Sequence, residues 1–368
     1  MKKIIFSTND AKRVLEIEIK KIEIFTKKGH KVYILCEKDM FYEELKKRID
    51  NVIPVNVNSK KISPIGDLKL IFEYYHIFKK INPDLIFNST IKPNIYGSIA
   101  SNFLKIKSIS KISGLGSTFQ QSFIMKFISK SLYKLSLKNN IKVLFQNQSD
   151  ASFFIDNRMV QSSQVSIIPI GVKLSERKNF YPKDNTHKTK FLYFGRPILS
   201  KGINEFLKSS KTLLSKYDTI EIHLAGDPKS ISDNFVRKKI FQMVDKYENR
   251  FFFHGYQKNV NTFIRKFDCM VMPSYREGMS NALLSAGANA IPSICTDVPG
   301  CREIIINNYN GFLCKPKNTR DLSLKMEKYY HLNTKERSQM GNISYKNTKN
   351  NFSFKNVEKY YLNILLNL

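Results

Sequence analysis

The stretch Phe191-Leu192-Tyr193-Phe194-Gly195-Arg196-Pro197-Ile198-Leu199-Ser200-Lys201-Gly202 joins an apolar run to residues 203–216, which have helical periodicity. It predicts a buried strand, a loop and a helix, in that order. The same order recurs from end to end of the chain, where short β-branched runs alternate with helical-period segments. This alternation is typical of βα units on parallel sheets, so we predict an α/β fold.

Two series of strands are predicted, on either side of a charged stretch that contains proline. The first series is expected at residues 3–7, 31–36, 52–55, 84–88, 108–112, 142–145 and 165–168. The second is expected at residues 191–194, 220–225, 251–254, 269–272, 293–296 and 311–314. At 368 residues the chain exceeds the usual size of one domain. We predict a first domain at 1–170, a linker at 171–189, a second domain at 190–348 and a terminal helix at 349–368.

Composition restricts the classes of partner. The chain has 61 Lys and Arg residues and 31 Asp and Glu residues, which gives a formal net charge of +30. This charge favours an anionic partner: nucleic acid, acidic lipid or a phosphorylated substrate. A general bias toward Lys, Asn and Ile explains part of this excess. No apolar run approaches the roughly 18 residues of a spanning helix, and the first run is too short for a signal peptide. The five cysteines are scattered without metal-ligand spacing, which is typical of a reducing compartment.

The loop after residues 191–194 carries two cations beside a predicted helix start. A helix N-terminus offers unpaired N–H groups and partial positive charge, so Arg196 and Lys201, with Gly195, could clamp a diphosphate. The alternative is an ordinary solvated loop.

A second loop follows the predicted strand at residues 269–272, with a helix expected to begin near Gly278. Glycine there would let a ligand approach the backbone. The amides that would face an anion are those of Met279, Ser280 and Asn281. A carboxylate beside a phosphate is unfavourable unless it binds hydroxyl groups, so Glu277 indicates a polyol such as a sugar ring. The alternative is that Glu277 only stabilises the helix N-terminus.

Further turns are expected at the same edge of the second sheet, because the carboxyl ends of parallel strands meet there. They contain Gly226 and Gly255. Residues 296–305 predict another strand, turn and helix start, in which Glu303 has a structural role as a helix-end carboxylate.

Several of these motifs, in this order, resemble retaining glycosyltransferases of family 4, particularly those that build bacterial surface polysaccharide on a lipid carrier. The resemblance covers nearly the whole chain. In the first half it rests on Asn82-Pro83-Asp84, Ile91-Lys92-Pro93-Asn94-Ile95-Tyr96-Gly97 and Ser113-Gly114-Leu115-Gly116-Ser117. In the second half it rests on Gly195-Arg196 with Lys201-Gly202, Ser274-Tyr275-Arg276-Glu277-Gly278, and Asp297-Val298-Pro299-Gly300-Cys301-Arg302-Glu303 with Asn310-Gly311.

The resemblance implies a GT-B fold, in which two Rossmann-like domains with parallel sheets face each other across a cleft and the terminal helix crosses back to the first, acceptor-binding domain. It implies that Arg196 and Lys201 bind the donor diphosphate, that Glu277 binds donor-sugar hydroxyls, and that these three form the catalytic set. The Met279 and Ser280 amides would bind phosphate. It also implies retention of anomeric configuration, with no cofactor and no metal.

The chain departs from the family pattern at two places. The family usually has a second glutamate eight positions after the first, to hold the ribose, and here that position is Ser285. A serine could reach a hydroxyl only through water or a shifted helix. The loop Gly114-Leu115-Gly116 lacks a histidine found in many relatives, and is a candidate for closing over donor and acceptor.

A basic helix is predicted at residues 123–138. Lys126, Lys130 and Lys134 recur every four residues, with Phe123 and Phe127 among them, which favours contact with an acidic membrane surface. A solvated lysine face is the alternative. The opposite side, expected to pack on the sheet, carries Ile124, Ile128, Leu132 and Leu135.

The sequence therefore predicts transfer of a sugar from a nucleotide-sugar donor, a UDP-linked hexose or N-acetylhexosamine, to a polyprenyl-diphosphate-linked glycan acceptor in O-antigen or capsule synthesis. The protein would be cytoplasmic and peripheral on the cytoplasmic face of the inner membrane. The alternatives are a non-catalytic GT-B partner protein and a sugar-nucleotide epimerase or hydrolase, although no histidine motif suggests the latter. No compact motif indicates a nucleic-acid partner.

Overall fold

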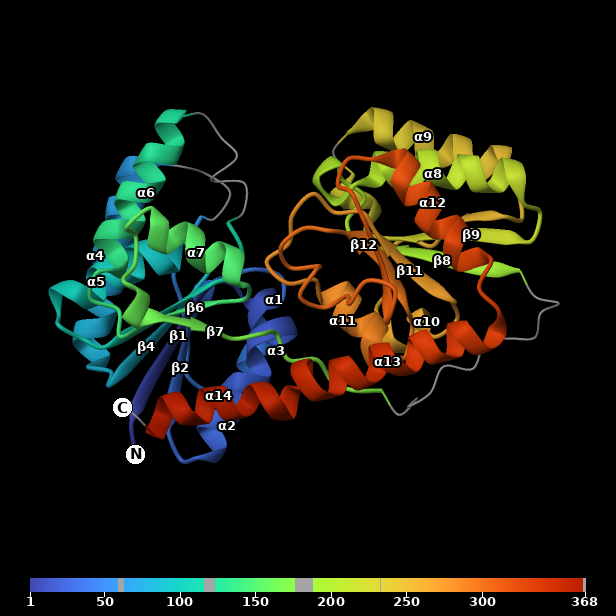
Figure 1. Cartoon of the computed structure of the whole chain (residues 1–368). Helices are drawn as coiled ribbons and strands as arrows, with labels where there is room; N and C mark the ends of the chain where they lie inside the picture. Colours follow the sequence, from blue (N-terminus) through green and yellow to red (C-terminus); the bar gives the residue numbers. More distant parts are fainter. Residues whose placement is uncertain (59–62, 116–122, 176–187, 232, 367–368) are drawn as a thin grey trace. The chain divides into compact units, whose positions relative to one another are not determined.

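The computed structural model describes residues 1–58, 63–115, 123–175, 188–231 and 233–366. The chain divides into two compact units. Unit 1 comprises Met1–Ile168 and Glu358–Leu368, and unit 2 comprises Pro169–Val357. Each unit is built on its own parallel sheet (Figure 1). The predicted α/β class is therefore confirmed.

Unit 1 contains a seven-stranded sheet in the order β3-β2-β1-β4-β5-β6-β7. Every pairing in it is parallel. The strands are β1 (Lys3–Asp10), β2 (Lys31–Glu37), β3 (Val52–Pro54), β4 (Leu85–Ser89), β5 (Ser108–Ile112), β6 (Lys142–Phe145) and β7 (Val165–Ile167). Each lies where the sequence predicts a strand, with ends shifted by a few residues, because buried parallel strands are short apolar runs.

Helices cover both faces of this sheet. On one face Phe25 packs edge-on against Phe6 and Phe87, and on the other face Ser7 donates a hydrogen bond to the hydroxyl of buried Tyr74. The helical segments are α1 (Ala11–Arg13), the π-helical η1 (Val14–Glu18), α2 (Ile19–Lys27), α3 (Tyr42–Lys46), α4 (Pro64–Ile81), the π-helical η2 (Pro93–Gly97), α5 (Ser98–Phe103), α6 (Phe123–Leu137), α7 (Gln148–Asp156) and the 3-10 turn η4 (Ser162–Gln164).

Unit 2 contains a six-stranded parallel sheet in the order β10-β9-β8-β11-β12-β13. Its strands are β8 (Thr189–Phe194), β9 (Ile220–Ala225), β10 (Phe251–Phe253), β11 (Cys269–Met272), β12 (Ser293–Thr296) and β13 (Gly311–Cys314). Its helical segments are η5 (Leu199–Lys201), α8 (Ile203–Lys216), η6 (Pro228–Ser230), α9 (Asn234–Lys246), α10 (Val260–Ile264), α11 (Asn281–Ala288), α12 (Thr319–Tyr330) and α13 (Thr334–Phe352). An apolar core lies on each face of the sheet, so the site loops stand on a rigid base.

The first described residues of the predicted linker pack on unit 2. The Val172 amide donates to the Phe352 carbonyl at 2.8 Å, and the Phe354 amide donates back to Val172 at 3.0 Å. An extended Ser353 separates α13 from α14 (Phe354–Leu366). Along α14 the chain leaves unit 2 at Val357 and enters unit 1 at Glu358. Tyr361 is buried there and packs against Lys21.

Candidate functional site

Three glycines meet at the carboxyl edge of the sheet in unit 2. The Gly195 amide donates to Ala225 at 2.9 Å, and the Gly226 amide donates to Gly255 at 2.9 Å. A Cβ on Gly226 would lie 2.1 Å from the Gly195 carbonyl oxygen, so only glycine fits this contact. The structure thus brings the loops after β8, β9 and β10 together, as expected for the edge where such folds bind ligands.

The loop after β8 is also fixed against the loop after β11. Gly202 has a left-handed φ of +70°, and a Cβ there would lie 1.9 Å from the Pro273 carbonyl oxygen. The Tyr275 amide donates to Ser200 at 3.0 Å. The Tyr275 hydroxyl donates to Glu205 at 2.9 Å, and burial, together with this carboxylate, raises the pKa of Tyr275 to about 12.

These contacts place Lys201 and Glu277 in direct contact. Lys201 Nζ donates to both carboxylate oxygens of Glu277, at 2.5 and 2.6 Å, and Ser274 Oγ donates to Glu277 Oε1 at 2.7 Å. The Glu277 side chain is 10% exposed, so the pair is only partly hydrated. Gly300 lies against the Glu277 backbone, where a Cβ would approach to 2.6 Å. The lysine and the glutamate therefore compensate each other's charge.

Arg196 is the cation of this site that the protein itself leaves unpaired. It is exposed, and within the described ranges its guanidinium makes no hydrogen bond or ion pair. Its backbone is fixed nonetheless, because the hydroxyl of buried Tyr193 donates to the Arg196 carbonyl at 2.9 Å. A held backbone with a free guanidinium suits bidentate contact with phosphate.

The helix after the Glu277 loop begins later than predicted. It starts at Asn281 rather than near Gly278, because Ser280 is its N-cap and accepts from the Leu283 amide at 3.4 Å. Serine stabilises a helix start through its side chain, which glycine cannot do. The Ser280 amide donates to Gly300 at 3.0 Å, so the prediction that it faces an anion is wrong. Of the three predicted amides, that of Asn281 lies in the first turn of α11.

The neighbouring positions of this loop separate into buried and accessible residues. The side chain of Met279 is buried, and its sulfur accepts from the Ile170 amide. Ser285 lies on the partly exposed face of α11, one turn after Asn281, and its carbonyl accepts from Asn289 at 2.8 Å. Ser285 is therefore placed on the same face as the helix start, with its side chain accessible.

Residues 301–304 form turns rather than the predicted helix start, and Glu303 accepts from the Gly300 amide at 2.7 Å. This contact closes the turn that supports Glu277. Sequence reasoning missed Ser274 and Tyr275 as supports of the site. The signal was present, because Ser274 and Tyr275 stand three and two positions before Glu277 in the same motif, but the partners of Tyr275 lie on other segments.

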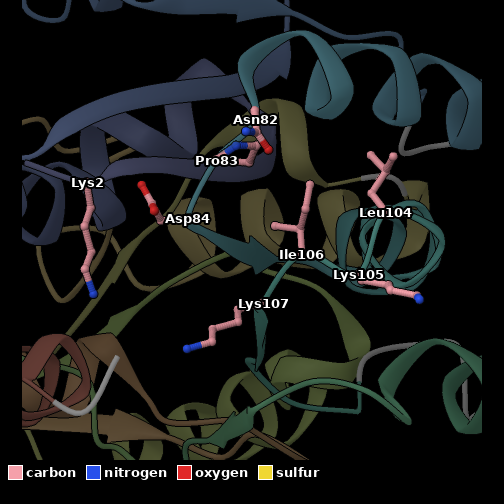
Figure 2. Close-up of a pocket in the computed structure, with 8 residues that line it drawn as sticks. All are labelled: Lys2, Asn82, Pro83, Asp84, Leu104, Lys105, Ile106 and Lys107. Atoms are coloured by element: carbon pink, nitrogen blue, oxygen red, sulfur yellow. The ribbon is translucent and has the colours of Figure 1, made fainter.

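In unit 1 the predicted acceptor motifs separate to opposite ends of the sheet. Asn82 caps the C-terminus of α4 with a left-handed φ of 50°, and Asp84 accepts from the Lys3 amide at 2.7 Å. They line a cavity of about 310 Å³ formed by the segments before β1, β4 and β5 (Figure 2). Asn82-Pro83-Asp84 therefore belongs to the amino edge, away from the edge where ligands bind in such sheets, and its role here is structural.

The other two motifs lie toward the carboxyl edge. Lys92 forms an ion pair of 2.7 Å with Asp67, both largely buried, beside a polar cavity of about 480 Å³. Glu73 also lines this cavity, and burial raises its pKa. Gly114 has a φ of +123°, whereas the side chain of Leu115 is buried in the core. Gly116 lies outside the described residues.

Helix α6 presents a different face to the sheet from the one predicted. Its buried side chains are Ser129, Tyr133, Ser136 and Leu137. Ile124, Ile128 and Leu135 are 69%, 43% and 62% exposed, so the prediction that they pack on the sheet is wrong, whereas Leu132 of the same predicted face is partly buried against the core. Apolar residues occur on both sides of this helix. The side that carries Ser129 and Ser136 is the buried one, because small serines allow close packing. Phe127 is 65% exposed, while the Phe123 side chain lies outside what the structure describes.

The cysteines and the side chains that could bind a metal do not form a further site in the described part of the chain. All five cysteines are free and buried, and burial raises the pKa of Cys36 and Cys314 to about 12. Across the described ranges, no three His, Cys, Asp or Glu side chains gather to hold a metal ion. In the same part of the chain no helix is both long and apolar enough to cross a membrane.

Known proteins share this architecture. Among curated proteins, the chain is 27% identical, over 80% of each chain, to the N,N'-diacetylbacillosaminyl-diphospho-undecaprenol alpha-1,3-N-acetylgalactosaminyltransferase of Campylobacter jejuni. It is 23% identical to the UDP-Gal:alpha-D-GlcNAc-diphosphoundecaprenol alpha-1,3-galactosyltransferase of Escherichia coli, over 69% of this chain and 68% of that one. The crystal structure of Anabaena Alr3699/HepE in complex with UDP and glucose superposes with a TM-score of 0.80 at 16% identity, over 100% of each chain.

Two family models match successive parts of the sequence. Residues 3–147 match the glycosyl transferase 4-like model, and residues 175–347 match the model of glycosyl transferases group 1. With two parallel sheets and GT-B structural neighbours, the chain belongs to the GT-B glycosyltransferases that join a glycosyl transferase 4-like domain to a group 1 domain.

Proposed function

We propose that this glycosyltransferase moves a sugar from a UDP-sugar, a hexose or N-acetylhexosamine, to a polyprenyl-diphosphate-linked glycan in surface polysaccharide synthesis, of the O-antigen or capsule type. The observation that carries the proposal is the group formed by Arg196, Lys201, Glu277 and Ser274 at the carboxyl edge of unit 2. The names of the Campylobacter and Escherichia relatives support a lipid-diphosphate acceptor, and the UDP complex of HepE supports the donor.

The site suits the departure of a nucleoside diphosphate. In the proposed reaction, the bond between the anomeric carbon and the β-phosphate oxygen breaks, an acceptor hydroxyl bonds to that carbon on the same face, and its proton leaves with the diphosphate. Arg196, Lys201 and the first turn of α11 would compensate the charge that develops on the leaving oxygen. Glu277 would accept hydrogen bonds from the donor sugar. No metal or other cofactor is part of this proposal.

The donor assignment is tested by Arg196→Gln. We expect the affinity for UDP to fall about 10- to 100-fold, since a charge-assisted hydrogen bond contributes about 1.5–3 kcal/mol. Lys208→Gln, on the exposed side of α8 in the same unit, is the charge-matched control and should bind UDP normally. Isothermal titration calorimetry measures both, and nucleoside diphosphate release from a panel of nucleotide-sugars with membranes measures turnover. Equal affinities in the two variants would contradict the assignment.

We also propose that α6 rests on an acidic membrane, on the cytoplasmic face of the inner membrane. Its outer face combines exposed Ile124, Phe127, Ile128 and Leu135 with lysines, and α4 exposes Ile65, Leu68 and Phe72 at helical spacing. Apolar insertion and attraction to acidic lipid headgroups act together on such surfaces. The lysines of α6 are Lys126, Lys130, Lys134 and Lys138, of which the last two are exposed.

Reversing the charge of Lys126, Lys130 and Lys134 to Glu is expected to lower binding to vesicles of phosphatidylglycerol and phosphatidylethanolamine at least tenfold. Each lysine near such a surface contributes about 1 kcal/mol, and the new carboxylates repel it. The control replaces Lys208, Lys211 and Lys238 of unit 2 with Glu, which changes the net charge equally. Vesicle co-sedimentation measures both variants. Equal loss in both would indicate general electrostatics, which contradicts a role of α6.

A further inference from the structure

A buried charge cluster lies beneath the carboxyl edge of the sheet in unit 1. At its centre is Glu18, the last residue of η1, which is 4% exposed. Its carboxylate contacts Lys21 and accepts from Lys111 at 3.2 Å and from Ser89 at 3.3 Å. Glu18, Lys21, Lys111 and Ser89 lie outside the predicted donor site and outside the motifs singled out in the sequence, although Ser113, the first residue of one such motif, adjoins them through Arg13.

Arg13 forms the accessible side of the cluster. Its Nη2 donates to Ser113 at 3.3 Å, and its Nε is buried without a hydrogen-bond partner in the part of the chain that is described. Asp10, three positions before Arg13, accepts from the Arg13 backbone amide. The guanidinium is thus held by Ser113 and partly exposed, with its buried Nε donor unused.

The strands beneath present further polar side chains on the same face. Ser89 pairs in register with Lys111, and Thr8 follows the last paired residue of β1, which places it beside Ser89. Thr8 is 2% exposed, and its hydroxyl has no partner among the described residues. A row of three polar side chains, Thr8, Ser89 and Lys111, therefore crosses β1, β4 and β5, and Arg13 interacts electrostatically with Lys111 at its end.

The cluster holds an excess of positive charge. Arg13, Lys21 and Lys111 are three basic side chains against the one carboxylate of Glu18, a formal excess of two when Lys111 is protonated and of one when it is not. Burial, with the neighbouring Lys21 and Arg13, lowers the pKa of Lys111 to about 7 even though Glu18 opposes this. Removing uncompensated charge from water is unfavourable, so an anion bound at Arg13 would stabilise the cluster.

We propose that this edge of unit 1 binds the diphosphate of the lipid-linked acceptor. Arg13 would bind it bidentately, because the planar guanidinium matches phosphate oxygens, and Ser113 and Thr8 would donate hydroxyl hydrogen bonds. Lys111 would supply charge from below, and the excess of positive charge matches a diphosphate better than a single carboxylate. Glu18 is a positioning residue that holds the two lysines when the site is empty. The choice of acceptor diphosphate rests on the proposed function.

The test compares Arg13→Gln with Lys12→Gln in the full-length protein. Lys12 is the adjacent residue, 44% exposed, and its replacement changes the net charge equally. The ligands for calorimetry are geranyl diphosphate, geranyl monophosphate and UDP. We expect Arg13→Gln to weaken geranyl diphosphate binding at least tenfold while UDP binding stays within twofold. Arg13→Lys should recover only part of the loss, and Lys12→Gln should bind like the unmodified protein.

Three results would overturn the proposal: equal weakening by both substitutions, weakening confined to UDP, or binding of the monophosphate as strongly as the diphosphate. A thermal transition unchanged in Arg13→Gln shows that a loss of binding is not a loss of fold. The test is separable from that of the proposed function. Turnover of a nucleotide-sugar with normal prenyl diphosphate binding in Arg13→Gln contradicts this inference alone. Binding through Arg13 without turnover of any nucleotide-sugar contradicts the proposed function alone.

Discussion

Replacing Glu277 with Gln is expected to lower kcat/KM for sugar transfer by about 10²- to 10³-fold, the size of effect known for losing one preorganised hydrogen-bonding group at a reacting centre. The glutamate binds Lys201 through both oxygens and also accepts from Ser274. Glutamine keeps the shape and one acceptor oxygen, but it releases the lysine and presents an amide to the donor sugar. Steady-state kinetics with the preferred nucleotide-sugar measures the loss.

Two controls sharpen this experiment. Glu248→Gln, an exposed carboxylate of the same unit, should leave kcat/KM unchanged. In a double-mutant cycle with Lys201→Met, the two losses should be strongly non-additive, because the residues act as one pair. Full transfer activity in Glu277→Gln would show that the site is misassigned. Strict additivity would show that the ion pair has no part in transfer.

The largest expected change in stability follows from Glu18→Gln, which leaves Lys21 and Lys111 buried without a counter-charge. Removing one partner of a buried ion pair costs about 3–5 kcal/mol of the free energy of unfolding. Glu16→Gln, on the exposed side of the same segment, is the matched control, with a side chain that is 52% exposed. Hydrogen exchange of peptides from β1, β4 and β5 in the full chain would detect the loss in unit 1. Unchanged protection in Glu18→Gln would contradict it.

The same carboxylate predicts how stability changes with pH. Its contacts with Lys111 and Lys21, opposed by burial, hold the pKa of Glu18 far below its usual range. A lowered pKa means that the stabilisation is complete above the unfolded value of about 4.3 and is lost as the pH falls below it. We therefore expect the difference in stability between Glu18→Gln and the unmodified protein to shrink in acid, as the glutamate of the unfolded chain becomes protonated.

The strands could be predicted from the sequence because each buried parallel strand is a short apolar run bounded by polar turns. Residues 269–272 and 293–296 illustrate this, since β11 and β12 have those same bounds. The contact of Lys201 with Glu277 could not be predicted from the residues alone. It joins positions far apart in sequence, and it depends on how closely Gly202 approaches the loop after β11.

The errors have local physical causes. In α6 the spacing of the lysines does not determine which face of the helix is buried, because apolar residues occur on both sides. Tyr133 and Leu137 pack inward, whereas Phe127 is exposed to solvent. For α11 we predicted a start near the glycine of the motif, Gly278. The helix begins later, because Ser280, two positions on, is its N-cap. The cluster around Glu18 was not anticipated, because its members are distributed over η1, α2, β4 and β5 and become neighbours only in the folded sheet.

The burial of every cysteine makes this chain convenient for site-specific labelling. Thiolates react with maleimide dyes; all five native cysteines are buried, and burial raises the pKa of Cys36 and Cys314 to about 12. A cysteine introduced at exposed Lys47 of unit 1 and another at exposed Lys238 of unit 2 would therefore take up dyes without removal of any native cysteine. Because the sequence also lacks tryptophan, fluorescence excited at long ultraviolet wavelengths would come from an introduced indole alone. Single-molecule energy transfer between the two dyes would then measure whether the distance between these two positions changes when a nucleotide-sugar is added.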